Sequence, residues 1–354
     1  MSRFLDGRFS HLEAYAPGEQ PRDKKYVKLN TNESPYPPSP KVIAAINSAE
    51  VADLRLYPDP TAVSLRTAIA GRYGLTPGQV SVGSGSDDLL NFCFMAFCGS
   101  GTGAAFPDIS YGFYKVYGEL YGLDCREIPL REDFTVAPED YYGLGRTIFI
   151  ANPNAPTGLA LTREQLRGVI EHNRGSVVVV DEAYVDFGAE SCAPLVDEYD
   201  NLIVTQTFSK SRSLAGARVG FALGSKELIA DLELMKFSTN PYSVNRLSLL
   251  AGEAAMRDGG YFEKCRAAVI AERERTRSEL LARGFEVLPS SANFVFARRD
   301  GTPGRELFLA LRERGVLVRR WDSPRIADWL RITIGSPEDM DALIAALDDI
   351  LKGA

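Results

Sequence analysis

Four β-branched residues in succession, Val177–Val180, constrain the fold more than any other feature of this chain. A strand with no polar face has to be covered on both sides, which is typical of a strand inside a parallel sheet. Further strands are predicted, with helical periodicity in the segments between most of them, at 79–82, 104–106, 146–151, 201–206 and 219–223. Repetition of strand and helix over roughly 200 residues predicts an α/β fold with a mostly parallel sheet.

Changes in composition divide the chain into three predicted parts. Residues 1–40 are rich in proline and glycine, and we expect an extended N-terminal arm that packs on the functional site and on a small domain. Residues 41–245 are predicted to form the large α/β domain. The third part, 246–354, is predicted to contain a long connector helix, from about Asn245 to Arg283, followed by a small α+β domain.

The composition is that of an ordinary globular protein of 354 residues, 45% hydrophobic and 25% charged. A formal net charge of −7 gives no electrostatic reason to expect a nucleic acid or an anionic membrane as a partner. We also expect no secretory signal and no membrane span, because no apolar run is long enough. Five cysteines without a CxxC pair, and two histidines outside any metal-binding motif, favour a cytoplasmic protein with reduced thiols and without a metal.

Polar residues gather just beyond the predicted strands, where open α/β sheets bind their ligands. The stretch at 205–220 reads TQTFSKSRSLAGARVG, and its small residues surround Thr207, Ser209, Lys210 and Arg218. A lysine in such a partly desolvated loop loses its charge more easily and can form a Schiff base with a carbonyl group. On its own, the same stretch is equally compatible with a solvated surface loop.

Two other strand ends supply complementary groups. The run of valines ends in Asp181 and Tyr184, after which another helix-like segment begins. The turn formed by Gly85, Ser86 and Asp87 opens a helix, and the free N–H groups of a helix N-terminus bind anions such as phosphate. A lysine, a carboxylate, a hydroxyl donor and a phosphate cup together are what pyridoxal phosphate (PLP) requires. The carboxylate keeps the cofactor's ring nitrogen protonated, so that the ring accepts electrons when a substrate Cα–H bond breaks.

This ordered set of motifs resembles that of the fold-type I, class II aminotransferases, and most closely their bacterial histidinol-phosphate branch. The resemblance covers nearly the whole chain, from KLNTNESPYPPSP near the N-terminus to SPRIADWLRITIG near the C-terminus. It implies a PLP-dependent transferase fold, with a mostly parallel central sheet in a large domain and a smaller α+β domain. It also implies amino transfer between glutamate and a phosphorylated partner, in a homodimer with shared active sites.

Carried over residue by residue, the resemblance implies three catalytic side chains. Lys210 resembles the Schiff-base lysine, Asp181 the partner of the pyridine nitrogen, and Tyr184 the donor to the cofactor's phenolic oxygen. The cofactor site that the resemblance implies further contains Gly85, Ser86, Asp87, Tyr111, Asn154, Thr207, Ser209, Arg218 and, reaching into the neighbouring subunit, Tyr57. The substrate contacts that it implies are Tyr15, Asn32, Arg319 and Arg331.

One position departs from the family's pattern. The family usually reads NPNNPTG, with an asparagine immediately before Pro-Thr-Gly that bonds the phenolic oxygen. Here that position is Ala155, which cannot donate a hydrogen bond. Either Asn154 supplies the bond or Tyr184 works alone. Loss of one neutral donor costs about 1 kcal/mol, which would change the pKa of the Schiff base more than it would abolish activity.

Two other activities share this scaffold and cofactor. Paired arginines accept a carboxylate as readily as a phosphate, so an aminotransferase for aromatic or other amino acids stays open. A lyase resembling threonine-phosphate decarboxylase is the other alternative, and it would release carbon dioxide instead of transferring the amino group. A non-catalytic regulator would need a fused basic DNA-binding segment, which we do not find in the sequence.

Overall fold

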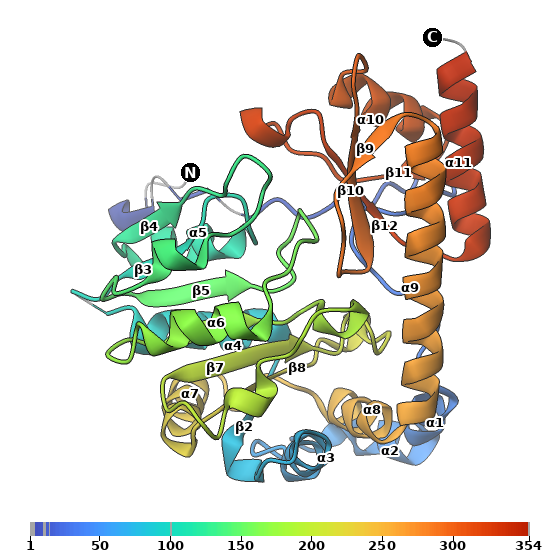
Figure 1. The fold of residues 1–354 in the computed structure, drawn as a ribbon. Helices are drawn as coiled ribbons and strands as arrows, with labels where there is room; N and C mark the ends of the chain where they lie inside the picture. Colours follow the sequence, from blue (N-terminus) through green and yellow to red (C-terminus); the bar gives the residue numbers. More distant parts are fainter. Residues whose placement is uncertain (1–3, 10–11, 14, 100, 353–354) are drawn as a thin grey trace.

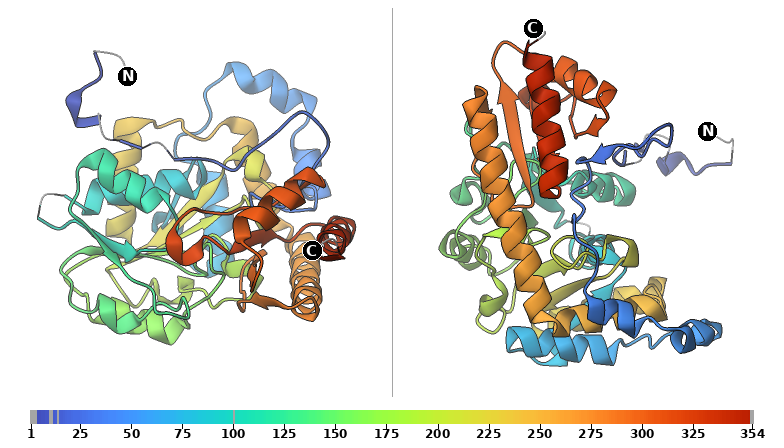
Figure 2. Two further views of the ribbon diagram at one scale, coloured as in Figure 1. Left: turned by 90° about the horizontal axis from the view of Figure 1, so that it is seen from above. Right: turned by 90° about the vertical axis from the view of Figure 1, so that its right-hand side faces the viewer.

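The computed structural model describes residues 4–9, 12–13, 15–99 and 101–352. They form two domains that are joined by a long helix, α9 (Gly259–Ala282) (Figure 1). The N-terminal segment contributes to both domains. Its strand β1 (Val27–Lys28) pairs with the small domain, and the chain then continues to α1 (Pro40–Ala45) and α2 (Ser48–Ala52), which pack against the large domain (Figure 2).

In the described part of the chain, the large domain contains a seven-stranded sheet in the order β2-β8-β7-β6-β5-β3-β4. In chain order its strands are β2 (Val80–Gly83), β3 (Ala104–Pro107), β4 (Cys125–Ile128), β5 (Thr147–Ala151), β6 (Val178–Asp181), β7 (Leu202–Thr207) and β8 (Gly220–Gly224). β8 is antiparallel to β2 and β7, and the other pairings in this sheet are parallel, which confirms the predicted mostly parallel sheet. The edge strand β4 was not predicted, because Arg126 and Glu127 make it polar and exposed.

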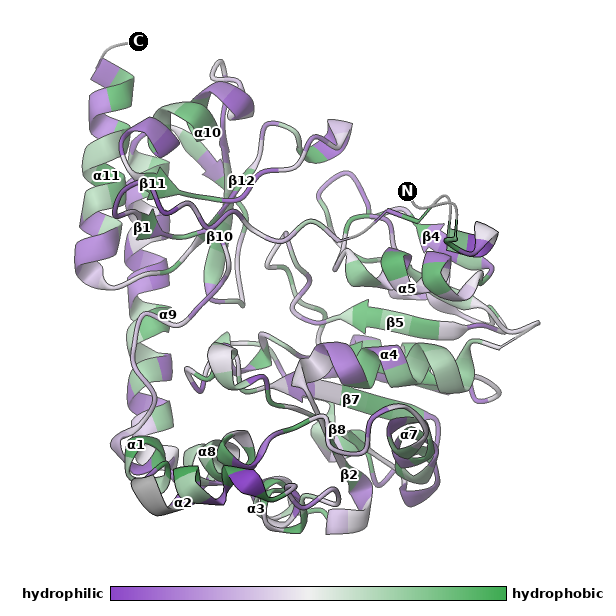
Figure 3. Ribbon diagram, turned by 180° about the vertical axis from the view of Figure 1, so that it is seen from behind, coloured by the Kyte–Doolittle hydropathy of each residue, from purple (hydrophilic) through white to green (hydrophobic). Residues whose placement is uncertain are grey.

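Helices cover both faces of this sheet. One face carries α4 (Gly85–Phe97), α5 (Phe113–Tyr121) and α7 (Lys226–Thr239), and the other carries α3 (Val63–Tyr73), α6 (Arg163–Glu171) and α8 (Arg246–Arg257). Strand β5 is apolar between these layers (Figure 3). Its Ile148 and Ile150 pack with the second group of helices, and Phe149 and Ala151 with the first. Because each strand buries both faces, an uninterrupted apolar run suits this sheet.

The small domain is built on a three-stranded antiparallel sheet in the order β12-β10-β9, beside a two-stranded parallel sheet of β1 and β11. Its elements are β9 (Phe285–Val287), β10 (Phe294–Arg299), α10 (Gly304–Glu313), β11 (Val316–Leu317), β12 (Leu330–Thr333) and α11 (Pro337–Lys352). Leu29, which follows β1, is buried in the same apolar cluster as Leu280 of α9 and Leu343 of α11. The N-terminal segment is thus part of this domain's core, while the predicted boundaries at 40 and 245 stay a prediction.

The predicted connector helix is wrong in one respect. The segment from Asn245 to Arg283 forms two helices, α8 and α9, that meet at Asp258. Gly259 and Gly260 follow directly, and glycine costs about 1 kcal/mol in a helix interior. Asp258 also accepts an ion pair from Lys41, which holds the junction near α1.

The helix-like segment expected after Tyr184 is also not an α-helix. It forms two short 3₁₀ turns, Val185–Phe187 and Ala193–Leu195. Gly188, whose φ is +134°, turns the backbone out of a helical path between them. Among the described residues, no helix is both long enough and apolar enough to cross a membrane.

Candidate active site

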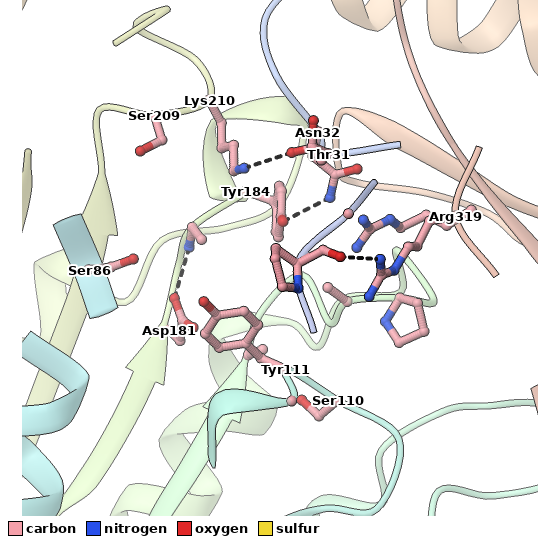
Figure 4. Close-up of a pocket in the computed structure, with 18 of the residues that line it drawn as sticks. Thr31, Asn32, Ser86, Ser110, Tyr111, Asp181, Tyr184, Ser209, Lys210 and Arg319 are labelled. Atoms are coloured by element: carbon pink, nitrogen blue, oxygen red, sulfur yellow. Dashed lines mark hydrogen bonds between the residues drawn. The ribbon is translucent and has the colours of Figure 1, made fainter. Parts of the chain in front are cut away.

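A cavity of about 510 Å³ lies at the edge of the large sheet where β3, β5, β6 and β7 end (Figure 4). The N-terminal segment and the small domain close its other sides. Most of the predicted site residues line it: Tyr15, Asn32, Ser86, Asp87, Tyr111, Asp181, Tyr184, Thr207, Ser209, Lys210, Arg218, Arg319 and Arg331. Parallel strands bring their carboxyl ends to one edge, so residues that follow different strands meet here.

Lys210 lies in the loop that follows β7 and points toward the N-terminal segment (Figure 4). Its Nζ donates a hydrogen bond to the backbone oxygen of Thr31 over 3.3 Å. Burial, and secondly the positive charge of Arg331, lower the pKa of Lys210 to about 8. About a tenth of the Lys210 side chains are therefore neutral amines at pH 7, far more than for an ordinary lysine, and the neutral amine is the form that attacks a carbonyl group.

Asp181 is the last residue of β6 and is almost completely buried. Tyr114 donates its hydroxyl to Oδ2 over 3.0 Å, and the backbone N–H of Ala183 donates to Oδ1 over 3.2 Å. Burial raises the pKa of Asp181 to about 6, and the hydrogen bonds from Tyr114 and Ala183 oppose that shift. A carboxylate held in this way stabilises a positively charged partner group in the cavity.

The first turn of α4 forms a polar cup at one end of the cavity. Arg218 bonds Oδ2 of Asp87 over 2.9 Å, and the hydroxyl of Tyr111 donates to the other carboxylate oxygen over 2.6 Å. Gly85 has a φ of +78°, and a Cβ there would lie 2.6 Å from Nη2 of Arg218. Glycine thus leaves room for the guanidinium beside the helix N-terminus. Thr207 and Ser209, at the end of β7 and in the loop after it, add two hydroxyl groups, which are hydrogen-bonded to each other over 2.9 Å.

Arg319 and Arg331 lie at the small-domain end of the cavity. Arg331 donates to the backbone oxygen of Asn30 over 3.1 Å, and Arg319 donates to those of Ala16 and Pro17. The ring of Trp321 contacts both, 5.2 Å from Cζ of Arg331 and 5.6 Å from that of Arg319. Neither arginine has a carboxylate within ion-pairing distance among the described residues. Two uncompensated positive charges favour an anionic ligand.

Tyr184 lies at the centre of the cavity, between the sheet edge and the N-terminal segment (Figure 4). Asn32 donates its amide N–H to the Tyr184 hydroxyl over 2.9 Å. The ring packs against Phe294 and lies near Ala155, which is buried in the same apolar cluster. Burial raises the pKa of Tyr184, so its hydroxyl keeps its proton.

Three of the predicted residues do not line this cavity: Gly85, which lies beside the guanidinium of Arg218 in the cup, Asn154 and Tyr57. Asn154 is buried beside the cavity, where its Nδ2 donates to the backbone oxygen of Ile109 and its Oδ1 accepts from Ser110. Its predicted contact with the cofactor stays a prediction that this geometry does not support. Tyr57 is 80% exposed and stacks on Tyr242, away from the cavity lining.

Two residues of the site were missed. Tyr114, which bonds Asp181, has a signal in the sequence: it lies in the first turn of α5, three residues after the predicted Tyr111, and the two rings pack edge to face. Trp321 has no such signal. It lies in an irregular loop, and folding of the small domain brings it against the two arginines.

The comparisons with known proteins agree with this geometry. The family model described as aminotransferase class I and II matches residues 24–347. The chain is 48% identical to a histidinol-phosphate aminotransferase of Brachyspira hyodysenteriae, over 99% of this chain and 100% of the relative. It is 52% identical to histidinol-phosphate aminotransferase 1 of Bordetella parapertussis, with the same coverage.

Solved structures match over nearly the full length. A histidinol-phosphate aminotransferase from Sinorhizobium meliloti, in complex with pyridoxal-5'-phosphate, gives a TM-score of 0.89 at 24% identity, covering 100% of this chain and 99% of that one. A tetra mutant of the Thermus thermophilus aspartate aminotransferase gives 0.82 at 20% identity, covering 98% and 99%. At these identities the two matches show the fold, which is that of an α/β aminotransferase with a second, smaller domain.

Proposed function

The chain belongs to the aminotransferase class I and II family, and we propose that it transfers an amino group between glutamate and imidazole-acetol phosphate, forming histidinol phosphate, with PLP as cofactor. Relatives that match at about half identity over their whole length carry the name histidinol-phosphate aminotransferase, which supports this substrate. The observation that carries the proposal is the pairing, in one cavity, of Lys210, whose pKa is about 8, with the buried carboxyl group of Asp181.

The residues in the cavity fit PLP. Asp181 would face the ring nitrogen, Tyr111 would lie against the ring, and Lys210 would bind the aldehyde carbon. The cup formed by the first turn of α4 with Arg218 and Ser209 offers N–H and O–H donors and a positive charge to a phosphate. When bound, the cofactor supplies the electron sink that lets a Cα–H bond of the substrate break.

The protein's own groups have distinct tasks in this reaction. With the cofactor bound to substrate, the Lys210 amine would take the proton from the substrate Cα and deliver it to the cofactor, and its low pKa of about 8 makes the neutral, accepting form accessible. Asp181, when charged, would hold a proton on the ring nitrogen of the cofactor. Tyr184 would donate its hydroxyl proton to the phenolic oxygen of the cofactor. The domains and the N-terminal segment cover the cavity, which limits the access of water to these groups.

The arginine pair supports a doubly charged substrate. A phosphate dianion neutralises both Arg319 and Arg331, whereas the side-chain carboxylate of glutamate neutralises one charge at a time. Both substrates of the proposed reaction therefore bind at the same end of the cavity in alternate half-reactions.

We further propose that the active form is a homodimer in the cytoplasm. Exposed apolar side chains gather around Leu54, Leu56 and Tyr57, and Tyr57 stacks on Tyr242 at 4.6 Å. Such a patch is typical of an interaction surface, and a second copy would bring Tyr57 to the partner's phosphate cup. Five free cysteines suit a reducing compartment. Sedimentation of the purified protein tests the dimer.

A panel of amino donors and acceptors that includes histidinol phosphate tests the proposed reaction. We expect formation of glutamate from 2-oxoglutarate to be fastest with histidinol phosphate. Faster transfer from aromatic amino acids would favour the broader aminotransferase. Release of carbon dioxide from a phosphorylated amino acid, without transfer to 2-oxoglutarate, would favour the lyase.

A further inference from the structure

Asn32 occupies an unusual position for a residue in an N-terminal segment. Only 1% of its surface is exposed, and its backbone is left-handed, with a φ of +55°. Four hydrogen bonds fix it. Its backbone N–H and side-chain Oδ1 both contact Thr333 Oγ1 over 3.0 Å, Asn293 Nδ2 donates to its backbone oxygen over 3.1 Å, and its Nδ2 donates to Tyr184 over 2.9 Å.

The direction of each hydrogen bond follows from what each group can do. The backbone N–H of Asn32 can only donate, so Thr333 Oγ1 accepts from it and donates its own proton to the side chain of Asn32. The atom of Asn32 that faces Thr333 is therefore its oxygen, and the NH₂ group faces Tyr184. The Tyr184 oxygen accepts there. Among the described residues, the Tyr184 hydroxyl has no protein acceptor for its own proton, which is left for the cavity.

We propose that Asn32 is a positioning residue that directs the Tyr184 hydroxyl proton toward the cofactor's phenolic oxygen, in place of the amide donor that Ala155 cannot supply. This inference rests on the proposed function, because it assumes that PLP occupies the cavity. Asn154 cannot replace the missing donor in this geometry, since its Nδ2 already donates to the backbone oxygen of Ile109 over 2.9 Å and to Oγ1 of Thr157 over 3.4 Å. The donor that remains is the Tyr184 hydroxyl, and Asn32 and Thr333 fix its direction.

The chemistry of the residue suits this task. Asparagine tolerates a left-handed backbone better than most residues, and its amide carries a donor and an acceptor on opposite sides. Aspartate would have the same shape but could only accept, so Tyr184 would donate to it and no longer to the cofactor. A donor to the phenolic oxygen stabilises its negative charge, which weakens that oxygen's attraction for the proton of the lysine Schiff base. Loss of the donor therefore raises the pKa of the Schiff base.

The experiment is a pH titration of the visible absorption band of the holoenzyme, which reports that pKa without any turnover. Asn32→Gly removes the amide and keeps a residue that accepts a positive φ. Thr333→Val keeps the side-chain shape and frees the amide to rotate. Asn293→Ala is the matched control, because it loosens the same backbone segment and leaves the amide contacts intact. Tyr184→Phe provides the background in which Asn32 has no hydroxyl to orient.

We expect Asn32→Gly to raise the pKa by roughly 0.7 unit, which corresponds to one hydrogen bond. Thr333→Val is expected to raise the pKa of the Schiff base as well, and Asn293→Ala is expected to leave it unchanged. In the Tyr184→Phe background, Asn32→Gly is expected to add no further shift.

An unchanged pKa in Asn32→Gly and Thr333→Val, with a normal visible band, would overturn the inference while leaving the proposed function intact. A shift that persists in the Tyr184→Phe background would also overturn it, because the effect would not pass through the hydroxyl. A wild-type protein that forms no visible band with PLP would remove the proposed function itself, and the inference with it.

Discussion

The half of the cavity around Asp181 and Lys210 is formed by the ends of neighbouring strands in one sheet. The half around Arg319 and Arg331 is formed by segments that meet across the whole chain. Arg331 bonds the backbone of Asn30, 301 residues away, and Arg319 bonds that of Pro17, 302 residues away. The first half is therefore set by the folding of the large domain, and the second by the docking of the N-terminal segment on the small domain.

This difference has a chemical consequence. In the strand-end half, burial is the largest cause of the shifted pKa of Asp181 and of Lys210, so the groups that act on the cofactor have most of their properties before a substrate binds. In the other half, Arg319 and Arg331 donate hydrogen bonds to backbone oxygens, but these do not neutralise their charges. A bound anion supplies the missing negative charge. We expect substitutions in the first half to reduce kcat and those in the second to change KM.

Lys210→Ala is expected to have the largest effect. Both the covalent link to the cofactor and the group that moves the Cα proton are lost, so turnover should fall by about four orders of magnitude or more. Transfer to 2-oxoglutarate and the visible absorption band measure the two losses separately. Lys226→Ala, an exposed lysine at the start of α7, is the control. A Lys210→Ala protein that still transferred amino groups at a substantial rate would contradict the assignment.

Asp181→Asn is expected to reduce kcat by about 10²–10³-fold with a smaller change in KM, because a negative charge aimed at the ring nitrogen is lost while the side-chain shape is kept. Steady-state kinetics measure the effect. Glu182→Gln is a matched control. Glu182 is also buried, with its pKa raised to about 7, but it bonds Ser191 and Gln206 away from the cavity. Equal losses of kcat in the two variants would point to a structural effect.

The pH dependence of cofactor binding tests whether the two halves are coupled. The folded pKa of Lys210 is about 8, below the ordinary 10.5, so the neutral amine predominates above pH 8. Stopped-flow absorbance after PLP is added to apoprotein should show a rate that rises up to tenfold per pH unit and levels off above about 8. The charge of Arg331 contributes to this low value, so Arg331→Gln should move the plateau to higher pH. An unmoved plateau would mean that the halves act independently.

The sequence predicted the first half of the cavity far better than the second. Asp181 ends β6, and Ser209 and Lys210 follow closely after β7; the apolar runs of both strands are visible in the chain, and parallel strands bring such ends together. The roles of Asn32 and Trp321 depend on contacts between segments far apart in sequence, and no local pattern encodes those. The break at Asp258 was missed too: α8 ends at Arg257 and α9 begins at Gly259, within a segment that was predicted as a single helix.

Arg319→Gln is expected to have the smallest effect and to distinguish two roles for this arginine. Its Nη groups hold the backbone oxygens of Ala16 and Pro17, so its loss should loosen the N-terminal segment beside Tyr15. We expect KM for histidinol phosphate to rise only a few-fold, because one hydrogen-bonding group is worth about 1 kcal/mol, and limited proteolysis at Arg22 to become faster. Arg331→Gln, which removes the more buried charge, should raise KM more and change proteolysis less, because Arg331 holds a single backbone oxygen, that of Asn30, next to β1. If Arg319→Gln raised KM as much as Arg331→Gln while Arg22 stayed protected, Arg319 would bind the substrate directly, and the N-terminal segment would be held by its strand pairing with β11.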